Sequence, residues 1–150
     1  MVLLSRRSLL AIAAVVDIAL HARPMPVAAK LLAGRHNLPP RHLETILQAL
    51  VRCGILKGLR GPRGGYELAR ERRRITAGDI VRAALTAGGD DGLPAAPESR
   101  LVTDIVAPAV QEASEAFLAQ LDAVSVDDLC RRAEQRAVFD SLSAAADFAI

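Results

Sequence analysis

The chain has 150 residues, of which 51% are hydrophobic and 24% are charged, an ordinary globular composition that excludes a disordered protein. A chain of this length buries enough surface to fold without disulfides or structural metal ions. Its two cysteines are too few for a disulfide scaffold. Aromatic residues make up only 3%, so the core must consist of aliphatic side chains and alanine, a mixture that favours helices.

The net charge of +2 conceals a strong asymmetry along the chain. Residues 1–82 contain 15 Lys and Arg against 5 Asp and Glu, a net charge of +10, whereas residues 83–150 contain 4 against 12, a net charge of −8. A basic segment joined to an acidic one indicates a polyanion-binding module attached to a segment with a different role. Chance clustering of solvated charges is the alternative explanation.

The first twenty residues allow two interpretations. Arg6 and Arg7 before an apolar run resemble a twin-arginine export signal, but Asp17 interrupts the run and no clean cleavage site follows. Apolar residues at helical spacing instead predict a mostly buried helix, and no segment has the roughly 20 uninterrupted apolar residues of a membrane span. The predicted apolar stripe consists of Leu9, Ile12, Ala13, Val16 and Leu20.

Two further helices are predicted in the basic half. Pro26 at a first helical turn predicts a short helix over residues 27–33. A pair of prolines then precedes a helix over residues 41–53, which ends at Gly54 as a C-terminal cap. The apolar face of this longer helix is predicted to consist of Leu43, Ile46, Leu47, Leu50 and Val51.

A β-hairpin is predicted next. Residues 55–60 form one strand candidate and residues 66–69 a second, in which apolar and polar side chains alternate; glycine and arginine make up the turn between them. Thr76 and Asp79 form a capping-box pattern at the start of another helix. Residues 86–100 are rich in Gly, Pro, Asp and Ala and predict a linker.

Apolar residues return after the linker at nearly heptad spacing, which predicts a helix that packs against a partner helix. Pro108 predicts either a kink in this helix or its start. Ser125 and Asp128 form a second capping-box pattern, which begins a C-terminal helix. The predicted dimerisation face consists of Val102, Val106, Val110, Ala113, Phe117 and Leu121.

Three helices followed by a hairpin, all within a basic segment, are the sequence order of a winged helix-turn-helix. The predicted fold class is therefore mostly α with a small β-hairpin. We divide the chain into a winged helix-turn-helix DNA-binding domain over residues 1–85, a linker or effector loop over residues 86–101, and a dimerisation helix with a C-terminal helix over residues 102–150.

In this motif the second helix of the pair lies in the major groove, where Arg reads guanine, Gln reads adenine and Glu reads cytosine. In the hairpin, glycines let the backbone approach a sugar–phosphate wall and arginines supply cations to phosphates. An ordinary tight turn with surface arginines is the alternative for the hairpin. The predicted DNA contacts are Pro40, Arg41, His42, Glu44, Thr45 and Gln48 in the helix, and Arg60, Gly61, Arg63, Gly64, Gly65 and Tyr66 in the hairpin.

These residues resemble a known family. The segments 38–44, 46–50, 54–56, 60–69 and 75–81 are similar to the Rrf-type regulators, bacterial winged-helix repressors that include the iron–sulfur-cluster regulator and the nitric-oxide-sensitive repressor. The most specific part is the sequence Arg-Gly-Pro-Arg-Gly-Gly-Tyr followed by Ile-Thr-Ala-Gly-Asp-Ile. The resemblance implies a homodimer joined by the long helix and bound to a near-palindromic operator, with contacts from Arg41, His42, Glu44, and Arg60 with its neighbours.

The chain departs from the family pattern where cluster-binding members carry three cysteines. Residues 86–107 contain neither Cys nor His, and thiolates are the normal ligands of iron–sulfur clusters. We therefore expect no cofactor, and in particular no iron–sulfur cluster. Cys53 is expected to be a small buried hydrophobe, as free cysteines usually are. No metal-ligand spacing relates the three histidines, so we expect no metal site.

No nucleophile–base set and no phosphate-binding loop is recognisable, so we expect no enzyme activity. The sequence predicts a DNA-binding transcriptional regulator, specifically a repressor, that acts as a homodimer in a bacterial cytoplasm without membrane association. Its expected partners are double-stranded DNA and a second copy of itself, and an unknown small-molecule effector is left open. The alternatives are an adaptor whose winged helix binds a protein and a regulator that senses redox state through the thiol of Cys53.

Overall fold

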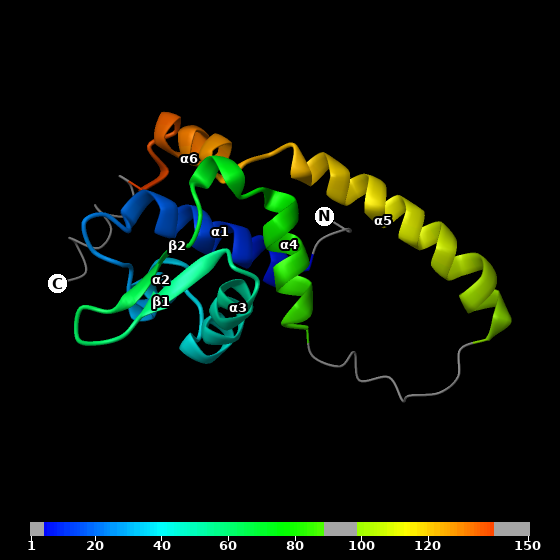
Figure 1. The fold of residues 1–150 in the computed structure, drawn as a ribbon, viewed down its shortest axis with the longest axis horizontal. Coiled ribbons are helices and arrows are strands. Elements are labelled where there is room, and N and C mark those ends of the chain that lie inside the picture. The colour runs from blue at the N-terminus through cyan, green and yellow to red at the C-terminus, as the bar shows by residue number, and fades with distance from the viewer. Residues whose placement is uncertain (1–4, 89–98, 140–150) are drawn as a thin grey trace.

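Helices make up most of the part of the chain that the computed structural model describes, residues 5–88 and 99–139 (Figure 1). The predicted fold class, mostly α with a small β-hairpin, is confirmed. The elements in chain order are α1 (Arg6–His21), α2 (Ala29–Arg35), α3 (Pro40–Arg52), β1 (Leu56–Leu59), β2 (Gly65–Leu68), η1 (Arg72–Arg74), α4 (Ala77–Thr86), η2 (Val102–Val106), α5 (Ala107–Asp122) and α6 (Val126–Gln135).

Helix α1 lies at the centre of the body, in contact with α3, α4, α6 and β2. The mostly buried helix predicted here is confirmed, but the predicted stripe is wrong in detail. Ala11, Val15 and Ile18 are fully buried, whereas Leu9 is 37% exposed. The prediction weighted large side chains, but alanines allow neighbouring helices to approach closely, so the alanine-bearing face is the one that turns inward.

Helices α2 and α3 form the predicted helix-turn-helix pair. Helix α2 begins two residues later than predicted, because Val27 is extended and forms an isolated antiparallel bridge with Tyr66 of β2. Helix α3 agrees with its prediction to within one residue at each end, and Gly54 after it has the positive φ of +72° expected of a cap. Within α3, Val51 is exposed and Ala49 is buried, so the observed apolar face contains Ala49 in place of the predicted Val51.

The hairpin is a two-stranded antiparallel sheet in which Leu56 lies opposite Leu68 and Leu59 lies opposite Gly65. Leu56 is buried against the body, while the turn between the strands is exposed. An ion pair of 2.8 Å between Lys57 and Glu67 joins the two strands on the exposed side. The base of the hairpin is therefore part of the core and its tip extends into solvent.

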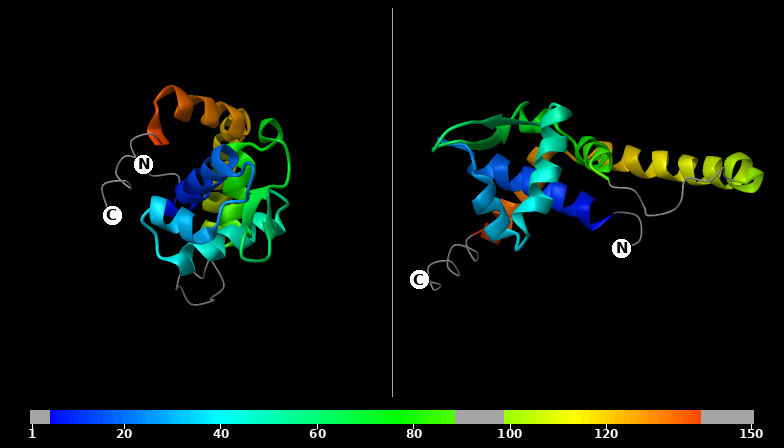
Figure 2. Two further views of the ribbon diagram at one scale, coloured as in Figure 1. Left: turned by 90° about the vertical axis from the view of Figure 1, so that its left-hand side faces the viewer. Right: turned by 90° about the horizontal axis from the view of Figure 1, so that it is seen from below.

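The second half of the chain contains both predicted capping boxes, at the starts of α4 and α6. Pro108 lies in the first turn of α5, directly after the π-helical η2, so it marks the start of the regular α-helix. Helix α5 extends away from the body and α6 returns to pack against α1 and η1 (Figures 1 and 2). Most of the predicted linker lies outside the described residues. Within the described ranges, no helix has the length and apolar character needed to cross a membrane.

Candidate nucleic-acid interface

Helix α3 has two faces of opposite character. Leu43, Leu47 and Leu50 are fully buried against the body. The opposite face carries the polar residues that the sequence analysis selected, and the structure places all of them in solvent: Arg41, His42, Glu44, Thr45 and Gln48. Pro40, also exposed, begins the helix. Helix α3 thus presents several hydrogen-bonding side chains to solvent, while its opposite face is packed rigidly against the body.

Two arginines that the sequence analysis assigned only to a possible export signal lie beside this face. Arg6 and Arg7 begin α1, and with His42 and Asn37 they line a hollow of about 400 Å³ between the first turns of α1 and α3. Arg7 Nη1 donates a hydrogen bond of 3.0 Å to the carbonyl oxygen of Ala87, so it is directed along the surface. The hollow adds positive charge next to the exposed face of α3, a placement that local sequence patterns do not reveal.

The hairpin tip presents a second group of cations. Arg60 and Arg63 are exposed, and neither has an ion-pair partner among the residues that the structure describes. Gly61, with φ of +109°, adopts a conformation that residues with a side chain rarely reach, and a Cβ atom there would meet nothing within 4 Å. Both the tip and α3 lie on the lower side of the body in Figure 1.

The other two glycines of the tip, Gly64 and Gly65, are held close to the backbone of the chain itself. A Cβ atom on Gly64 would lie 2.2 Å from the carbonyl oxygen of Leu59, and one on Gly65 would lie 2.4 Å from that of Val27. These glycines are therefore required for the chain to pack against itself. Tyr66 is half-buried and exchanges two backbone hydrogen bonds with Val27, of 2.8 and 2.9 Å, so it anchors the base of the hairpin to the segment before α2.

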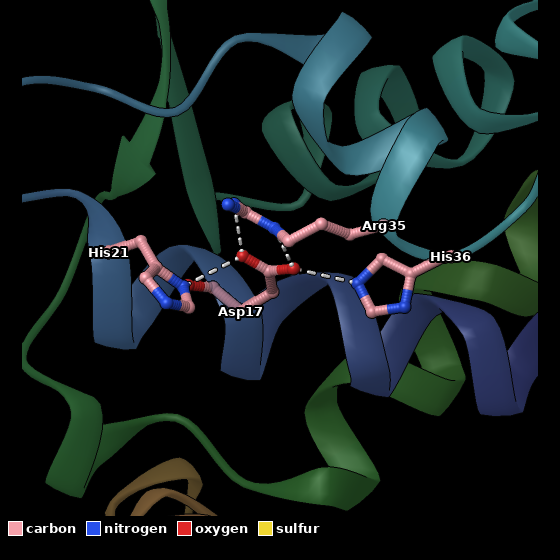
Figure 3. Close-up of polar contacts among 4 residues, drawn as sticks. All are labelled: Asp17, His21, Arg35 and His36. Atoms are coloured by element: carbon pink, nitrogen blue, oxygen red, sulfur yellow. Dashed lines mark hydrogen bonds and ion pairs between the residues drawn. The ribbon is translucent and has the colours of Figure 1, made fainter. Parts of the chain in front are cut away.

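A buried charged cluster holds α2 against α1 (Figure 3). Asp17 is completely buried, and Arg35 donates to both of its carboxylate oxygens, with Nε at 2.9 Å and Nη2 at 2.6 Å. His36 Nε2 lies 2.8 Å from Oδ2, and His21 Nδ1 lies 3.0 Å from Oδ1. His36 Nε2 and His21 Nδ1 each face a carboxylate oxygen, which can only accept a hydrogen bond, so each of these two nitrogens carries a proton and donates it. Arg35 and His36 lie at the end of α2 and directly precede the turn into α3, so this cluster positions α3.

The protonation of Asp17 reflects these contacts. Burial by itself raises the pKa of the carboxyl group, but the hydrogen bonds from His36 and Arg35, together with the positive charge of Arg35, lower the pKa below its ordinary value of 3.8. Asp17 is therefore ionised in the folded protein. In the sequence, Asp17 stands out only as an interruption of an apolar run, because Arg35 and His36 lie 18 and 19 residues further along the chain.

Helix α5 and the preceding η2 expose a row of apolar side chains. Val106 is 44% exposed and Val110 is 59% exposed, and Ala113 is also in solvent. The remaining members of the predicted dimerisation face, Val102, Phe117 and Leu121, are half-buried. Leu101 and Ile105, which the heptad spacing did not include, are 65% and 63% exposed. The most exposed apolar side chains thus lie in the part of the projecting segment that is far from the body.

Comparison with known proteins identifies the family. A sequence model of the Rrf2 family, described as an iron-dependent transcriptional regulator, matches residues 4–132. The chain belongs to the Rrf2 family. This confirms the resemblance seen in the hairpin sequence and in the segments around it.

Individual Rrf2 relatives agree with this assignment. The protein rrf2 of Nitratidesulfovibrio vulgaris is 30% identical over 121 residues, which cover 78% of this chain and 79% of that protein. The transcriptional regulator CymR of Bacillus subtilis is 42% identical over 57 residues, which cover 38% of this chain and 41% of CymR. The chain spans about half the length of several other curated relatives that it matches.

Solved Rrf2-type structures share the fold. The structure of IscR from T. potens has a TM-score of 0.66 at 28% identity, and the match covers 89% of each chain. CymR of B. subtilis, described as the global cysteine regulator, has a TM-score of 0.63 at 25% identity, covering 88% of this chain and 98% of CymR. The winged-helix fold of the transcriptional regulators IscR and CymR is therefore also the fold of this chain.

The residues of the described ranges do not fit the iron site that the Rrf2 description implies. No group of three or more His, Cys, Asp or Glu side chains within residues 5–88 and 99–139 could hold a metal ion. Two histidines do lie beside Asp17, but its oxygens accept hydrogen bonds from Arg35, whose guanidinium charge opposes a cation there.

The two cysteines occupy opposite environments. Cys130 is buried in α6, and this burial raises the pKa of its thiol. Cys53 is exposed, so the expectation that it is a buried hydrophobe is wrong. It follows the last residue of α3, where the chain turns away through Gly54, and the side chain of a residue at such an end leaves the packed face of the helix.

Proposed function

We propose that this Rrf2-family chain is a transcriptional repressor that binds a near-palindromic operator in double-stranded DNA as a homodimer in the bacterial cytoplasm. The observation that carries the proposal is the combination of two exposed elements on one side of the body. One is the polar face of α3, backed by fully buried leucines, and the other is the hairpin tip with two arginines free of ion pairs among the described residues.

Each element suits one part of the duplex. The major groove admits an α-helix, and the exposed Arg41, Glu44 and Gln48 carry the groups that distinguish guanine, cytosine and adenine by their hydrogen-bonding edges. Arg60 and Arg63 at the hairpin tip supply cations to the adjacent phosphates or to a narrow minor groove. Base contacts from α3 would give specificity, and phosphate contacts from the hairpin would give most of the affinity.

The salt dependence of DNA binding tests this assignment. A duplex of random sequence, titrated at increasing salt concentration, should bind with an affinity whose logarithm falls linearly with the logarithm of the salt concentration. Replacing Arg60 or Arg63 with Ala should reduce the slope by about one for each phosphate that the arginine neutralises. Arg132→Ala, an exposed arginine on α6, is the matched control and should leave the slope unchanged. Folded protein that shows no salt-dependent binding contradicts the proposal.

The exposed apolar side chains of η2 and α5 support the homodimer. Ile105 and Val110 are 63% and 59% exposed in the single chain, and a partner helix with the same residues would remove them from water. Ile105→Asp and Val110→Asp should convert a dimer into a monomer in sedimentation experiments while the fold is retained. Leu31→Asp on α2, where Leu31 is 58% exposed, is the control and should leave the dimer intact. A monomeric wild-type protein contradicts this part of the proposal.

Repression is tested once an operator has been selected from random duplexes. With that operator placed over a promoter, addition of the protein should reduce transcript formation in a purified transcription system. Unchanged or increased transcription at a saturated operator contradicts the repressor assignment but leaves DNA binding in place.

Regulation through the thiol of Cys53 is a second candidate, favoured by the exposure of this residue directly after α3. Alkylation of Cys53 with N-ethylmaleimide should then weaken DNA binding, and Cys53→Ser should be insensitive to the reagent. If alkylated and untreated protein bind a selected operator equally well, Cys53 has no regulatory role.

A further inference from the structure

An ion pair at the inner end of α5 holds this projecting helix to the DNA-binding body. Arg82 on α4 donates through Nη1 and Nη2 to the two carboxylate oxygens of Asp122, the last residue of α5, at 2.7 and 2.9 Å. Thr76 Oγ1 adds a hydrogen bond of 3.5 Å to Asp122 Oδ1. A bidentate arginine–carboxylate pair constrains orientation as well as distance, so this pair constrains the angle between α4 and α5.

Gly78 provides the space for this pair. It is buried in the first turn of α4, and a Cβ atom there would lie 1.9 Å from Asp122 Oδ1. Glycine weakens a helix relative to alanine, so its presence in α4 needs a reason. The carboxylate of Asp122 is that reason, because any side chain at position 78 displaces it.

Among the described residues, backbone hydrogen bonds to other elements hold the residues that follow α5 and not α5 itself. Thr76 and Ser125, the N-cap residues of α4 and α6, form an isolated antiparallel bridge, and the two backbone hydrogen bonds around it are each 2.8 Å long. The start of α6 is therefore attached firmly to the start of α4. The direction of α5 depends on its packing against α4 and on the ion pair between Arg82 and Asp122.

The most exposed apolar side chains of the projecting segment lie at its other end. Leu101 and Ile105 are 65% and 63% exposed, whereas the end of α5 that contains Asp122 lies at the body (Figure 1). At 1.5 Å per residue, the helical segment between these two ends is roughly 30 Å long. A rotation of about 7° at the Asp122 end therefore moves the far end by about 3.4 Å, the rise of one base pair.

We propose that Arg82 and Asp122 are positioning residues that set the spacing between the two half-sites of the operator. The inference rests on the homodimer proposed above, in which the two α3 helices are connected through both α5 helices. If the angle between α4 and α5 is fixed, the dimer fits one half-site spacing, since each additional base pair also rotates the second half-site by about 35° around the duplex. If this angle can vary, the dimer fits several spacings.

Selection of duplexes from a random-sequence library tests this inference without knowledge of the natural operator. The wild type should select inverted half-sites with one dominant spacing. Arg82→Ala deletes the cation and Gly78→Ala occupies the place of the carboxylate, so the two variants break the pair in different ways. Both should retain the half-site sequence and accept neighbouring spacings.

The size of the effect follows from the exposure of the pair. An exposed ion pair changes an equilibrium by a factor of about 1.5 to 5, and the dimer contains two such ion pairs. The ratio of affinities for the dominant and the neighbouring spacings should therefore fall by about 2-fold to 25-fold. Arg131→Ala, which removes ion pairs within α6 only, is the matched control and should retain the wild-type ratio.

The possible outcomes separate the inference from the function on which it rests. If the wild type selects one spacing and both variants select the same one, or if the variants lose the half-site sequence itself, the positioning role is wrong and the proposed dimer stands. If the wild type selects no paired half-sites, the proposed function fails and the inference fails with it. Thermal unfolding of all variants within a few degrees of the wild type verifies that they are folded.

Discussion

Replacement of Asp17 by Asn keeps the size of the side chain and removes its charge, so it tests how strongly the buried carboxylate holds α2 against α1. Asp17 accepts two hydrogen bonds from Arg35, one from His36 and one from His21. The amide presents an NH2 group to side chains that are themselves donors. At least one of these hydrogen bonds is then broken, and the Arg35 guanidinium has no counter-charge.

The magnitude follows from the burial of the partners. Removing one partner of a buried ion pair costs about 3–5 kcal/mol of stability. The Arg35 side chain is 27% exposed, so water compensates part of the loss and we expect the lower end of this range, about 3 kcal/mol. In a chain of this length each kcal/mol shifts the melting temperature by about 2–4 °C, so Asp17→Asn should melt about 6–12 °C below the wild type.

Urea unfolding followed by circular dichroism measures this difference. The midpoint should fall while the slope of the transition stays unchanged, since the surface exposed on unfolding is the same. Asp104→Asn is the matched control. Its partner Arg100 is 95% exposed, so the free energy of unfolding should change by less than about 1 kcal/mol.

The result that contradicts this reasoning is an Asp17→Asn protein within about 1 kcal/mol of the wild type, because the buried carboxylate would then contribute no more than a surface ion pair. The DNA affinity of the variant, measured where it is folded, provides a second check. It should fall, because Arg35 and His36 at the end of α2 directly precede the turn into α3.

Three further predictions concern the stability at low pH, the packing of two glycines and the reactivity of the two thiols. Because the pKa of Asp17 is lower in the folded chain than in the unfolded one, its contribution to stability is complete above about pH 4 and is lost as the pH falls through the lowered value. The urea midpoint of the wild type should therefore fall more steeply below about pH 4 than that of Asp17→Asn. Parallel curves of midpoint against pH for the two proteins contradict this. Gly64→Ala should destabilise the protein by about 1–3 kcal/mol in thermal unfolding, because its Cβ atom meets a carbonyl oxygen. Gly34→Ala, with open space around it in α2, should instead stabilise by up to about 1 kcal/mol, and the reverse order is inconsistent with the observed packing. A chromogenic thiol reagent should react with Cys53 in the native protein and with Cys130 only after unfolding, and two reactive thiols in the native state refute the observed burial.

Features that depend on neighbours within a few residues were predictable from the sequence. The capping boxes at Thr76 and Ser125 form as predicted, because each consists of bonds between residues three positions apart. The start of α3 at Pro40 and its end before Gly54 follow from backbone preferences of single residues. The polar face of α3 follows from helical periodicity, which does not depend on the surrounding fold.

Only the tertiary structure decided features that depend on which distant segments meet. Asp17 is a buried ion-pair partner because α2 returns across α1, and Gly64 is required because the hairpin turn closes against its own first strand. The same holds for the Arg82–Asp122 pair, whose members are 40 residues apart. Periodicity shows that a helix has an inward face, but the sizes and positions of its neighbours decide which residues that face includes.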